Sequence, residues 1–278
     1  MKAATTIREV REWRRSSGSE VGLVPTMGYL HAGHASLVET ARRENPRVAA
    51  SVFVNPTQFG PGEDFARYPR SLERDQALLD AAGCDLLFAP SVEEMYPQPQ
   101  QVFVDPGPIA TPLEGERRPG HFRGVATVVV TLLGIFEPTR AYFGQKDAQQ
   151  LAVIRRIGRD LKLPAEIVGC PTKRDADGLA LSSRNSYLTP EERRAAPVLH
   201  RALQAAGELW ARGERNGEAL RAAMRGVLAR EPLARTDYAS AADPETFLEI
   251  GEARGSVLLS MAVFLGRARL IDNLLLEE

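Results

Sequence analysis

The sequence predicts an α/β protein with a doubly wound parallel sheet and a smaller C-terminal α+β domain. Short apolar runs alternate with helix-patterned segments through roughly the first 170 residues. Strand, helix and strand in this order imply right-handed crossovers and helices on both faces of a sheet. Near Pro171 the composition changes to charged loops and longer helical segments. We therefore expect two domains, residues 1–170 and 171–278.

Each element of the first domain follows from a local pattern. A continuous apolar run such as 48–54 suits a strand that is covered on both faces. The expected strands are 21–24, 48–54, 85–90, 141–143 and 165–170. Apolar residues at helical spacing predict helices over 7–15, 36–43, 72–82, 125–136 and 147–160. Pro25 ends the first apolar strand because proline has no N–H for a ladder.

Two further regions are less regular. Residues 97–119 are rich in proline, glycine and charge, and we expect a long loop with one short strand at 102–104. In the second domain Thr189 and Pro190 are typical of a helix start. Helices are expected from there to about 212 and over 217–230. Alternating stretches near Tyr238, over 257–264 and over 268–271 predict a small antiparallel sheet.

Composition excludes several classes of protein. Lys and Arg total 35 against 36 Asp and Glu, so the net charge of -1 argues against a nucleic-acid partner. Cys84 and Cys170 lie in apolar surroundings and are expected to be packing residues in a reducing compartment. Neither a signal peptide nor a membrane-length apolar stretch is seen, so we expect a cytoplasmic protein without a membrane partner.

The first candidate site is the loop between the strand at 21–24 and the helix at 36–43. It contains two glycines and two histidines, His31 and His34, at a spacing that puts both rings on one face of a first helical turn. The N-terminus of a helix carries unpaired N–H groups and suits a phosphate. A metal pair or two solvated histidines are the alternatives, although a metal site needs further ligands nearby.

A second candidate site follows the next strand, at Asn55 to Gln58. Neutral amides at the carboxyl end of a strand can hold a small polar ligand, because ligands of open α/β sheets bind there. Ordinary turn chemistry, which Asn-Pro also favours, is the alternative and accounts for this stretch on its own.

Two more stretches fit phosphate binding. Gly144-Gln145-Lys146-Asp147 places a lysine at a helix start, where it opposes the helix dipole unless a phosphate lies beside it. Asp147 is suited to a Mg²⁺ that bridges phosphates. Leu181-Ser182-Ser183-Arg184 offers two hydroxyls and a guanidinium for a phosphate clamp. A surface Lys-Asp pair and a capped linker are the respective alternatives.

Familiar alternatives to this kind of nucleotide site are missing from the sequence. It has no GxxxxGK[ST] motif, no GxGxxG after a strand and no GxSxG elbow. His31-Ala32-Gly33-His34 is instead similar to the HxGH signature of the nucleotidylyltransferase superfamily. Further stretches narrow this resemblance to the pantothenate synthetase (pantoate–β-alanine ligase) family. They are Pro25–Gly28, Val54–Phe59, Gly120–Val125, Gly144–Asp147, Asp177–Asn185 and Arg269–Asn273.

The resemblance implies a homodimer with a Rossmann-like N-terminal domain and a smaller C-terminal lid. It implies that ATP and pantoate form pantoyl adenylate and pyrophosphate, and that β-alanine then gives pantothenate and AMP, with Mg²⁺ as the metal. The catalytic residues would be His34 as proton donor, His31 and Lys146. One departure is Gln145, where many members carry Glu; a flanking position in a glycine turn tolerates that change.

Binding residues are also carried over by motif. ATP would contact Met27, Gly28, Tyr29, Leu30, His31, Ala32, Gly33, His34, Gly144, Gln145, Lys146, Asp147, Lys173, Leu181, Ser182, Ser183 and Arg184. Pantoate and β-alanine would be held by Gln58, Gln150, Pro25, Met27 and Asn55. Either Asp147 or Asp75 would meet the metal.

The implied chemistry suits these residue types. The carboxylate of pantoate attacks the α-phosphate itself, so the protein must align two anions and stabilise the developing charge. Two other hypotheses are open at this point: another nucleotidyltransferase or small synthetase of the superfamily, or a nucleotide-binding regulator without catalysis. The regulator would have no need of Gln58 and Gln150, and turnover of pantoate and β-alanine separates all three.

Overall fold

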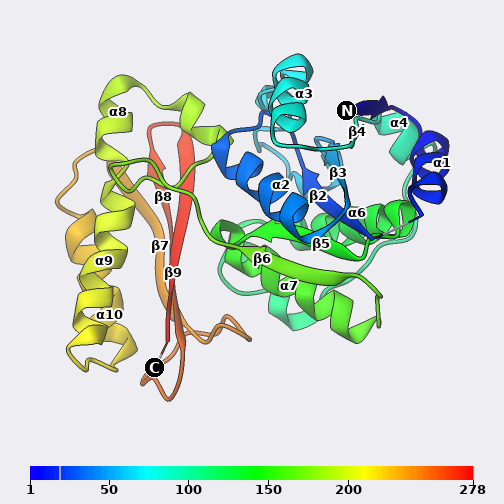
Figure 1. Ribbon diagram of the computed structural model, residues 1–278. Coiled ribbons are helices and arrows are strands. Elements are labelled where there is room, and N and C mark those ends of the chain that lie inside the picture. The colour runs from blue at the N-terminus through cyan, green and yellow to red at the C-terminus, as the bar shows by residue number, and fades with distance from the viewer. Residues whose placement is uncertain (19, 278) are drawn as a thin grey trace. The chain divides into compact units, whose positions relative to one another are not determined.

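The computed structural model describes residues 1–18 and 20–277. These residues form two compact units (Figure 1). Unit 1 comprises Met1–Gln145 and Gln150–Pro171, and unit 2 comprises Lys146–Gln149 and Thr172–Glu278. Each unit has its own sheet and its own buried core.

Unit 1 is built on a six-stranded parallel sheet with the order β1-β4-β3-β2-β5-β6. Its strands are β1 (Lys2–Ala4), β2 (Val21–Thr26), β3 (Arg47–Val52), β4 (Leu86–Phe88), β5 (Arg140–Gly144) and β6 (Glu166–Cys170). Its α-helices are α1 (Ile7–Ser17), α2 (Ala32–Glu44), α3 (Leu72–Ala81), α4 (Val92–Met95), α5 (Glu114–Arg117), α6 (His121–Phe136) and α7 (Ala148–Asp160). Its short 3₁₀ turns are η1 (Pro56–Gln58), η2 (Phe65–Arg67) and η3 (Gly107–Ala110). The turn η4 (Gln145–Asp147) and the first two residues of α7 include Lys146–Gln149, which belong to unit 2.

Helices cover both faces of this sheet (Figure 1). One cluster of buried side chains joins the strands to α1, α6 and α7, and includes Val10, Phe136 and Ile154. A second cluster joins them to α2 and α3, and includes Val38 and Leu79. The central strands carry buried apolar residues on both faces, such as Val21–Val24 in β2 and Val48–Ala50 in β3, because both faces are covered.

Unit 2 contains a three-stranded antiparallel sheet in the order β7-β8-β9, with α9 and α10 packed on it (Figure 1). Its elements are η5 (Ser183–Tyr187), α8 (Pro190–Ala195), α9 (Val198–Ala211), α10 (Gly217–Leu228), β7 (Ala234–Ala242), β8 (Val257–Leu265) and β9 (Ala268–Leu276). The predicted fold class, a doubly wound parallel sheet with a smaller antiparallel α+β part, is confirmed.

Some predicted elements were wrong. Residues 102–104 form no strand: Val102 is largely exposed, and the Val104 amide donates to the Thr127 hydroxyl rather than to a neighbouring strand. The segment from 190 to 212 is two helices, since Pro197 at the break has no N–H to continue the first one. The sequence pattern also missed β1, which is three residues long.

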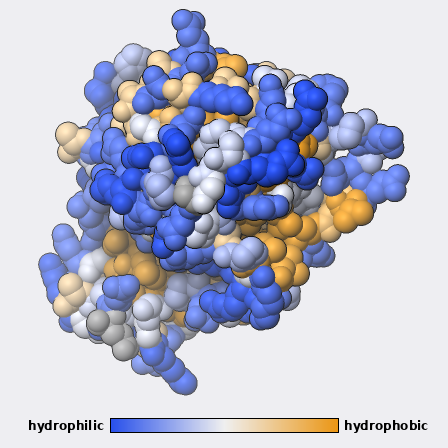
Figure 2. Space-filling view, turned by 45° about the vertical axis from the view of Figure 1, so that its right-hand side comes forward, coloured by the Kyte–Doolittle hydropathy of each residue, from blue (hydrophilic) through white to orange (hydrophobic). Residues whose placement is uncertain are grey.

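The surface is mainly hydrophilic on the face that Figure 2 shows. Large apolar side chains that are exposed lie far apart in the sequence, for example Val102, Leu161 and Leu248. Among the described residues, no helix has the length and apolar character needed to cross a bilayer.

Candidate active site

Ligands of open parallel sheets bind beyond the carboxyl ends of the strands, where the strand order changes direction. In unit 1 this point lies between β2 and β5, which are neighbours although the chain runs from β2 to β3 and β4 first. The segment after β2 carries the two histidines, the segment after β3 carries Asn55 and Gln58, and β5 ends at Gly144. Three of the predicted stretches therefore meet this edge of the sheet.

The loop from β2 to α2 is held by a buried carboxylate from α3. Asp75 accepts hydrogen bonds from the amides of Tyr29 (2.7 Å) and Leu30 (2.6 Å). Gly28 has φ 88° and a Cβ there would lie 2.8 Å from a Val52 methyl, so the turn requires glycine. The loop is a constrained turn with a defined path into α2.

Asp75 was a candidate metal ligand, and the structure gives it another task. It is 1% exposed, and both carboxylate oxygens already accept backbone hydrogen bonds. Burial raises the pKa of Asp75, while the bonds from Leu30 and Tyr29 oppose that rise. We therefore keep only Asp147 as a proposed ligand of Mg²⁺.

The two histidines cap α2 with their rings. His31 is the N-cap residue and its Nδ1 accepts from the Gly33 amide at 3.1 Å. His34 Nδ1 accepts from the His31 amide at 3.3 Å, and the ring centroids are 4.1 Å apart. Because Nδ1 accepts in both rings, the proton of each neutral imidazole lies on Nε2. The sequence placed both residues in the helical turn; it did not predict that the rings would act as caps.

Asn55 and Gln58 lie in one turn but have different hydrogen-bond partners. Asn55 is 1% exposed; its amide donates to Gln58 Oε1 (3.1 Å) and its oxygen accepts from Thr57 and from the Tyr96 hydroxyl (2.9 Å each). Gln58 Nε2 instead donates to the Met27 sulfur at 3.0 Å. A thioether is a weak acceptor, so a ligand oxygen would be a better partner for this buried amide. Asn55 thus supports Gln58, and Gln58 and Met27 lie in contact.

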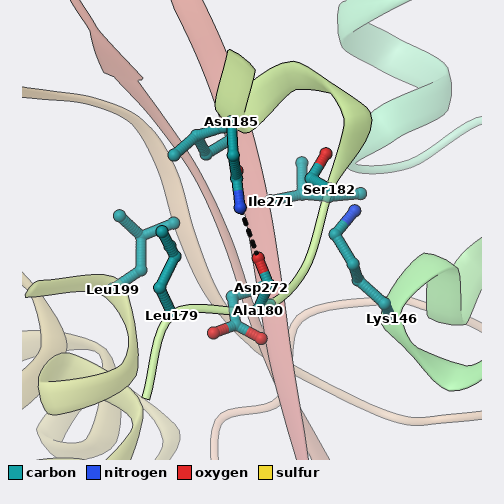
Figure 3. A pocket seen from close by; sticks show the side chains of 9 residues that line it. Lys146, Leu179, Ala180, Ser182, Asn185, Leu199, Ile271 and Asp272 are labelled. Carbon is teal, nitrogen blue, oxygen red and sulfur yellow. Dashed lines mark hydrogen bonds between the residues drawn. The ribbon is translucent and has the colours of Figure 1, made fainter. Parts of the chain in front are cut away.

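Lys146 lies with the serine loop in unit 2. Together with Ser182, Asn185 and Asp272 it lines a small pocket, and its ammonium group points toward Ser182 (Figure 3). The Asn273 amide donates to the Lys146 carbonyl at 2.7 Å, which anchors the lysine backbone to β9. Asp147 Oδ1 is 3.9 Å from Lys146 Nζ and is about half exposed.

The loop before η5 is folded by its own backbone and by an ion pair. Leu181 N donates to the Lys173 carbonyl (2.9 Å), and the exposed Lys173 side chain lies at the start of the loop. Arg174 donates to both oxygens of the buried Asp272 at 2.6 and 2.8 Å. Ser182 caps η5 by accepting from the Arg184 amide at 3.3 Å, and Ser183 is buried beside it.

The remaining predicted residues are distributed over both units. The expectation that Pro25 ends the strand was wrong: Pro25 is half-buried within β2, which continues to Thr26 in register with Val52 of β3. Gln145 is exposed in η4, and Gln150 is half-buried in α7. Among the described residues there is no group of three or more histidine, cysteine, aspartate or glutamate side chains arranged to hold a metal.

Sequence reasoning missed two supports of this site. The contact of Asp75 with the β2–α2 loop spans 46 residues, and His121 contacts Gln58 over 63 residues. Residues so far apart in the sequence share no motif from which their contact could be predicted. For Asp75 the available signal was its position as an acidic residue on an otherwise apolar helix face.

The fold and the histidine-capped helix together define an α/β nucleotide-binding enzyme. The family model described as pantoate-beta-alanine ligase matches residues 2–275. The chain is 61% identical over 277 residues to the pantothenate synthetase of Roseiflexus sp. (strain RS-1), covering 100% of both chains. It thus belongs to the pantoate-beta-alanine ligase family.

Solved structures agree with this result. The crystal structure of pantothenate synthetase from Thermus thermophilus has a TM-score of 0.94 at 54% identity, with 99% of each chain covered. The pantoate-beta-alanine ligase from Francisella tularensis, crystallised with beta-gamma ATP and beta-alanine, has a TM-score of 0.81 at 36% identity, covering 99% of this chain and 97% of that one. The predicted enzyme class and reaction are confirmed: the protein is a ligase that joins pantoate to β-alanine in an ATP-dependent reaction.

Proposed function

We propose that the ligation proceeds through an enzyme-bound pantoyl adenylate. The pantoate carboxylate attacks the α-phosphorus of ATP, and the bond to pyrophosphate breaks. The amine of β-alanine then attacks the acyl carbon, loses a proton and displaces AMP. This route needs no nucleophile from the protein, only alignment of two anions and stabilisation of charge.

The observation that carries this proposal is the pair of histidine rings at the N-terminus of α2. Since each Nδ1 is an acceptor, each Nε2–H is the donor that the ring can offer to a phosphate oxygen. Helix N–H groups and the helix dipole favour the same anion. We assign His34 as the proton donor of the first step, with His31 beside it.

For the acid substrate, we propose that Gln58 and Gln150 donate to pantoate oxygens, and that Gln58 also meets β-alanine. The support is the Gln58 amide, whose present acceptor is only the Met27 sulfur. Met27 and Pro25 would form the apolar wall for the gem-dimethyl group. Asn55 would act through Gln58, since its oxygen and its amide are already occupied.

For the nucleotide, we propose that Lys146, with the loop Leu181–Arg184, binds the phosphates. The support is the shared pocket of Lys146 and Ser182 within unit 2 (Figure 3). The β2–α2 loop and the Gly144–Asp147 turn would complete the nucleotide contacts, and the backbone near Lys173 would meet the adenine. Asp147 would hold Mg²⁺, which neutralises phosphate charge when bound.

We also propose the larger organisation that the family resemblance implies. Residues 1–170 would bind ATP and pantoate, and residues 171–278 would act as a lid that shields the adenylate from water. The enzyme would work as a homodimer in the cytoplasm, where its substrate ATP is available. The molar mass measured by light scattering during size-exclusion chromatography tests whether the protein is a dimer.

Isotope exchange between labelled pyrophosphate and ATP tests the adenylate. The expected result is exchange that requires pantoate and Mg²⁺ and proceeds without β-alanine. Lys146→Ala should abolish the exchange while retaining cooperative thermal unfolding. Exchange that appears only after β-alanine is added would contradict an adenylate that forms before β-alanine reacts. Normal exchange in Lys146→Ala would show that Lys146 does not bind the phosphates.

A further inference from the structure

The turn that carries Gln58 is packed directly against the first turn of α6. A Cβ on Gly124 would lie 2.3 Å from the Thr57 carbonyl oxygen and 2.7 Å from the Gln58 Cα, so the two backbones touch. The Asn55 amide also donates to the Gly124 carbonyl at 3.3 Å. The position of Gln58 therefore depends on the N-terminal end of a helix that is distant in sequence.

His121, the first residue of α6, makes a defined hydrogen bond to this turn. Its Nδ1 lies 2.8 Å from the Gln58 carbonyl oxygen, which can only accept, so Nδ1 carries the proton. Its Nε2 lies 3.0 Å from Arg118 Nη1, which can only donate, so Nε2 accepts. The ring is 9% exposed and is thus held in one neutral tautomer by a partner on each side.

Arg118 is itself fixed by a carboxylate. It donates to both oxygens of Glu63 at 2.9 and 2.7 Å, and both side chains are mostly shielded from solvent. A bidentate arginine–carboxylate pair has little rotational freedom. The series Glu63, Arg118, His121 and the Gln58 carbonyl therefore forms a continuous chain of hydrogen bonds that ends at the backbone of the proposed pantoate residue.

We propose that His121 is a positioning residue for the acid substrate, acting through the Gln58 backbone. Its Nδ1–H fixes the orientation of the turn Pro56–Gln58, and that orientation aims the Gln58 amide at the substrate. The inference rests on the proposed role of Gln58. It adds a second residue, outside the substrate's reach, on which affinity for pantoate depends.

Three substitutions at His121 separate the two ring nitrogens. In His121→Asn the amide nitrogen takes the place of Nδ1 and can still donate to the Gln58 carbonyl. In His121→Gln the amide takes the place of Nε2, so the bond to Gln58 is lost, and in His121→Leu both bonds are lost. We expect the pantoate KM to rise about 5–10-fold in the Gln and Leu variants, the loss of one net hydrogen bond. The Asn variant should lie near the native value, and the KM for ATP should stay unchanged in all three.

A control on the same helix separates positioning from general destabilisation. Thr127 is buried, and its hydroxyl accepts from the Val104 amide, away from Gln58. Thr127→Val should lower the melting temperature without raising the pantoate KM. If it raises the pantoate KM as much as His121→Gln does, the histidine has no specific effect and the inference is wrong.

A double-mutant cycle with Gln58→Ala tests the route. If His121 acts through Gln58, His121→Gln should change the pantoate KM little in the Gln58→Ala background, because the group it aims is gone. Full additivity would overturn the inference and leave Gln58 as a pantoate residue. An unchanged pantoate KM in Gln58→Ala alone would overturn the role of Gln58 and the inference with it.

Discussion

The two histidines at the start of α2 have two different nitrogens in use. Each Nδ1 caps the helix backbone, and in the proposed reaction each Nε2–H would be the donor to a phosphate oxygen. A histidine in this position would therefore hold the local structure and serve the proposed reaction at once. This arrangement explains why the two residues stand three apart, at the N-cap and N3 positions of a capping box.

Substituting His34 separates these two tasks. His34→Ala loses the cap and the Nε2 donor, whereas His34→Gln loses the cap but places an amide donor near the position of Nε2. We expect the alanine variant to form adenylate on the order of 10²–10³-fold more slowly, as for other lost transition-state donors. The glutamine variant should be much less affected, although both should lose similar stability. Rapid-quench measurement of pyrophosphate release checks this, and equal rates in the two variants would assign the loss to the cap.

Asp75→Asn tests whether this buried carboxylate holds the loop or a metal. An asparagine has one oxygen for the two amides of Tyr29 and Leu30, so one hydrogen bond is replaced by a donor facing a donor. We expect a loss of about 1–3 kcal/mol in the free energy of unfolding. The Mg²⁺ concentration for half-maximal activity should not change. A strong shift in that concentration with unaltered stability would restore Asp75 as a metal ligand.

At the scale of elements, α6 combines a tight contact at one end with open space at the other. Gly124 touches the turn that carries Gln58, whereas a Cβ on Gly134 in the same helix would meet nothing within 4 Å. Glycine lowers helix propensity at both positions, but only at Gly124 does close packing require it. Alanine substitutions at the two positions therefore separate the effect of packing from the effect of helix propensity.

Gly124→Ala should destabilise the fold by about 1–3 kcal/mol through overpacking and should raise the pantoate KM. Gly134→Ala should stabilise it by up to about 1 kcal/mol and leave the pantoate KM unchanged. Urea unfolding measures the free energy of unfolding of both variants, and steady-state kinetics measure their pantoate KM. If both variants behave alike, the approach of α6 to the turn is not a tight contact in solution.

At the scale of the whole molecule, one buried histidine contributes to acid sensitivity. Burial, and then the Arg118 charge, lower the pKa of His121 to about 4 from an ordinary value of 6.5, against the smaller opposing effects of the hydrogen bond to the Gln58 carbonyl, Glu63 and Glu114. Between these two values the unfolded chain binds a proton that the folded chain does not, so stability falls as the pH falls. The effect is absent above about pH 6.5 and reaches about 3 kcal/mol near pH 4.

His121→Asn removes this titration while retaining the donor to Gln58. Its unfolding free energy should therefore fall less steeply than that of the native protein between pH 6.5 and pH 4. Urea midpoints measured in steps across this range compare the two slopes. Parallel curves would show that His121 is already accessible to protons in the folded state.

The two units have separate cores, which predicts separate responses to a core mutation. Leu259 on β8 is fully buried in unit 2, and Leu259→Ala should cost about 2–5 kcal/mol there. Hydrogen exchange should accelerate in β7, β8 and β9 and stay slow in β2, β3 and β5. Equal acceleration in all six strands would mean that both units unfold as one cooperative body.

Local patterns in the sequence determined most of the fold of this protein, and the resemblance carried by its motifs predicted the reaction it catalyses. Apolar runs and caps depend on neighbouring residues, so most strands of the larger sheet and the Thr189–Pro190 helix start followed from them. The helix expected over 36–43 instead begins at Ala32, because the His31 ring caps it. The Gly144–Asp147 turn and the amides of Asn55 and Gln58 were visible because each closely follows a strand. The predicted strand at 102–104 failed because an isolated apolar triplet does not specify a partner.

The tertiary structure alone decided how these residues are held. Packing brings Asp75 to the β2–α2 loop, sets the tautomer of His121 and places the Asn55 amide against the Gln58 side chain. Each of these arrangements depends on which donor and acceptor groups the folded chain brings within hydrogen-bond distance. Such choices are settled only when the chain is compact, because burial then makes an unpaired polar group costly.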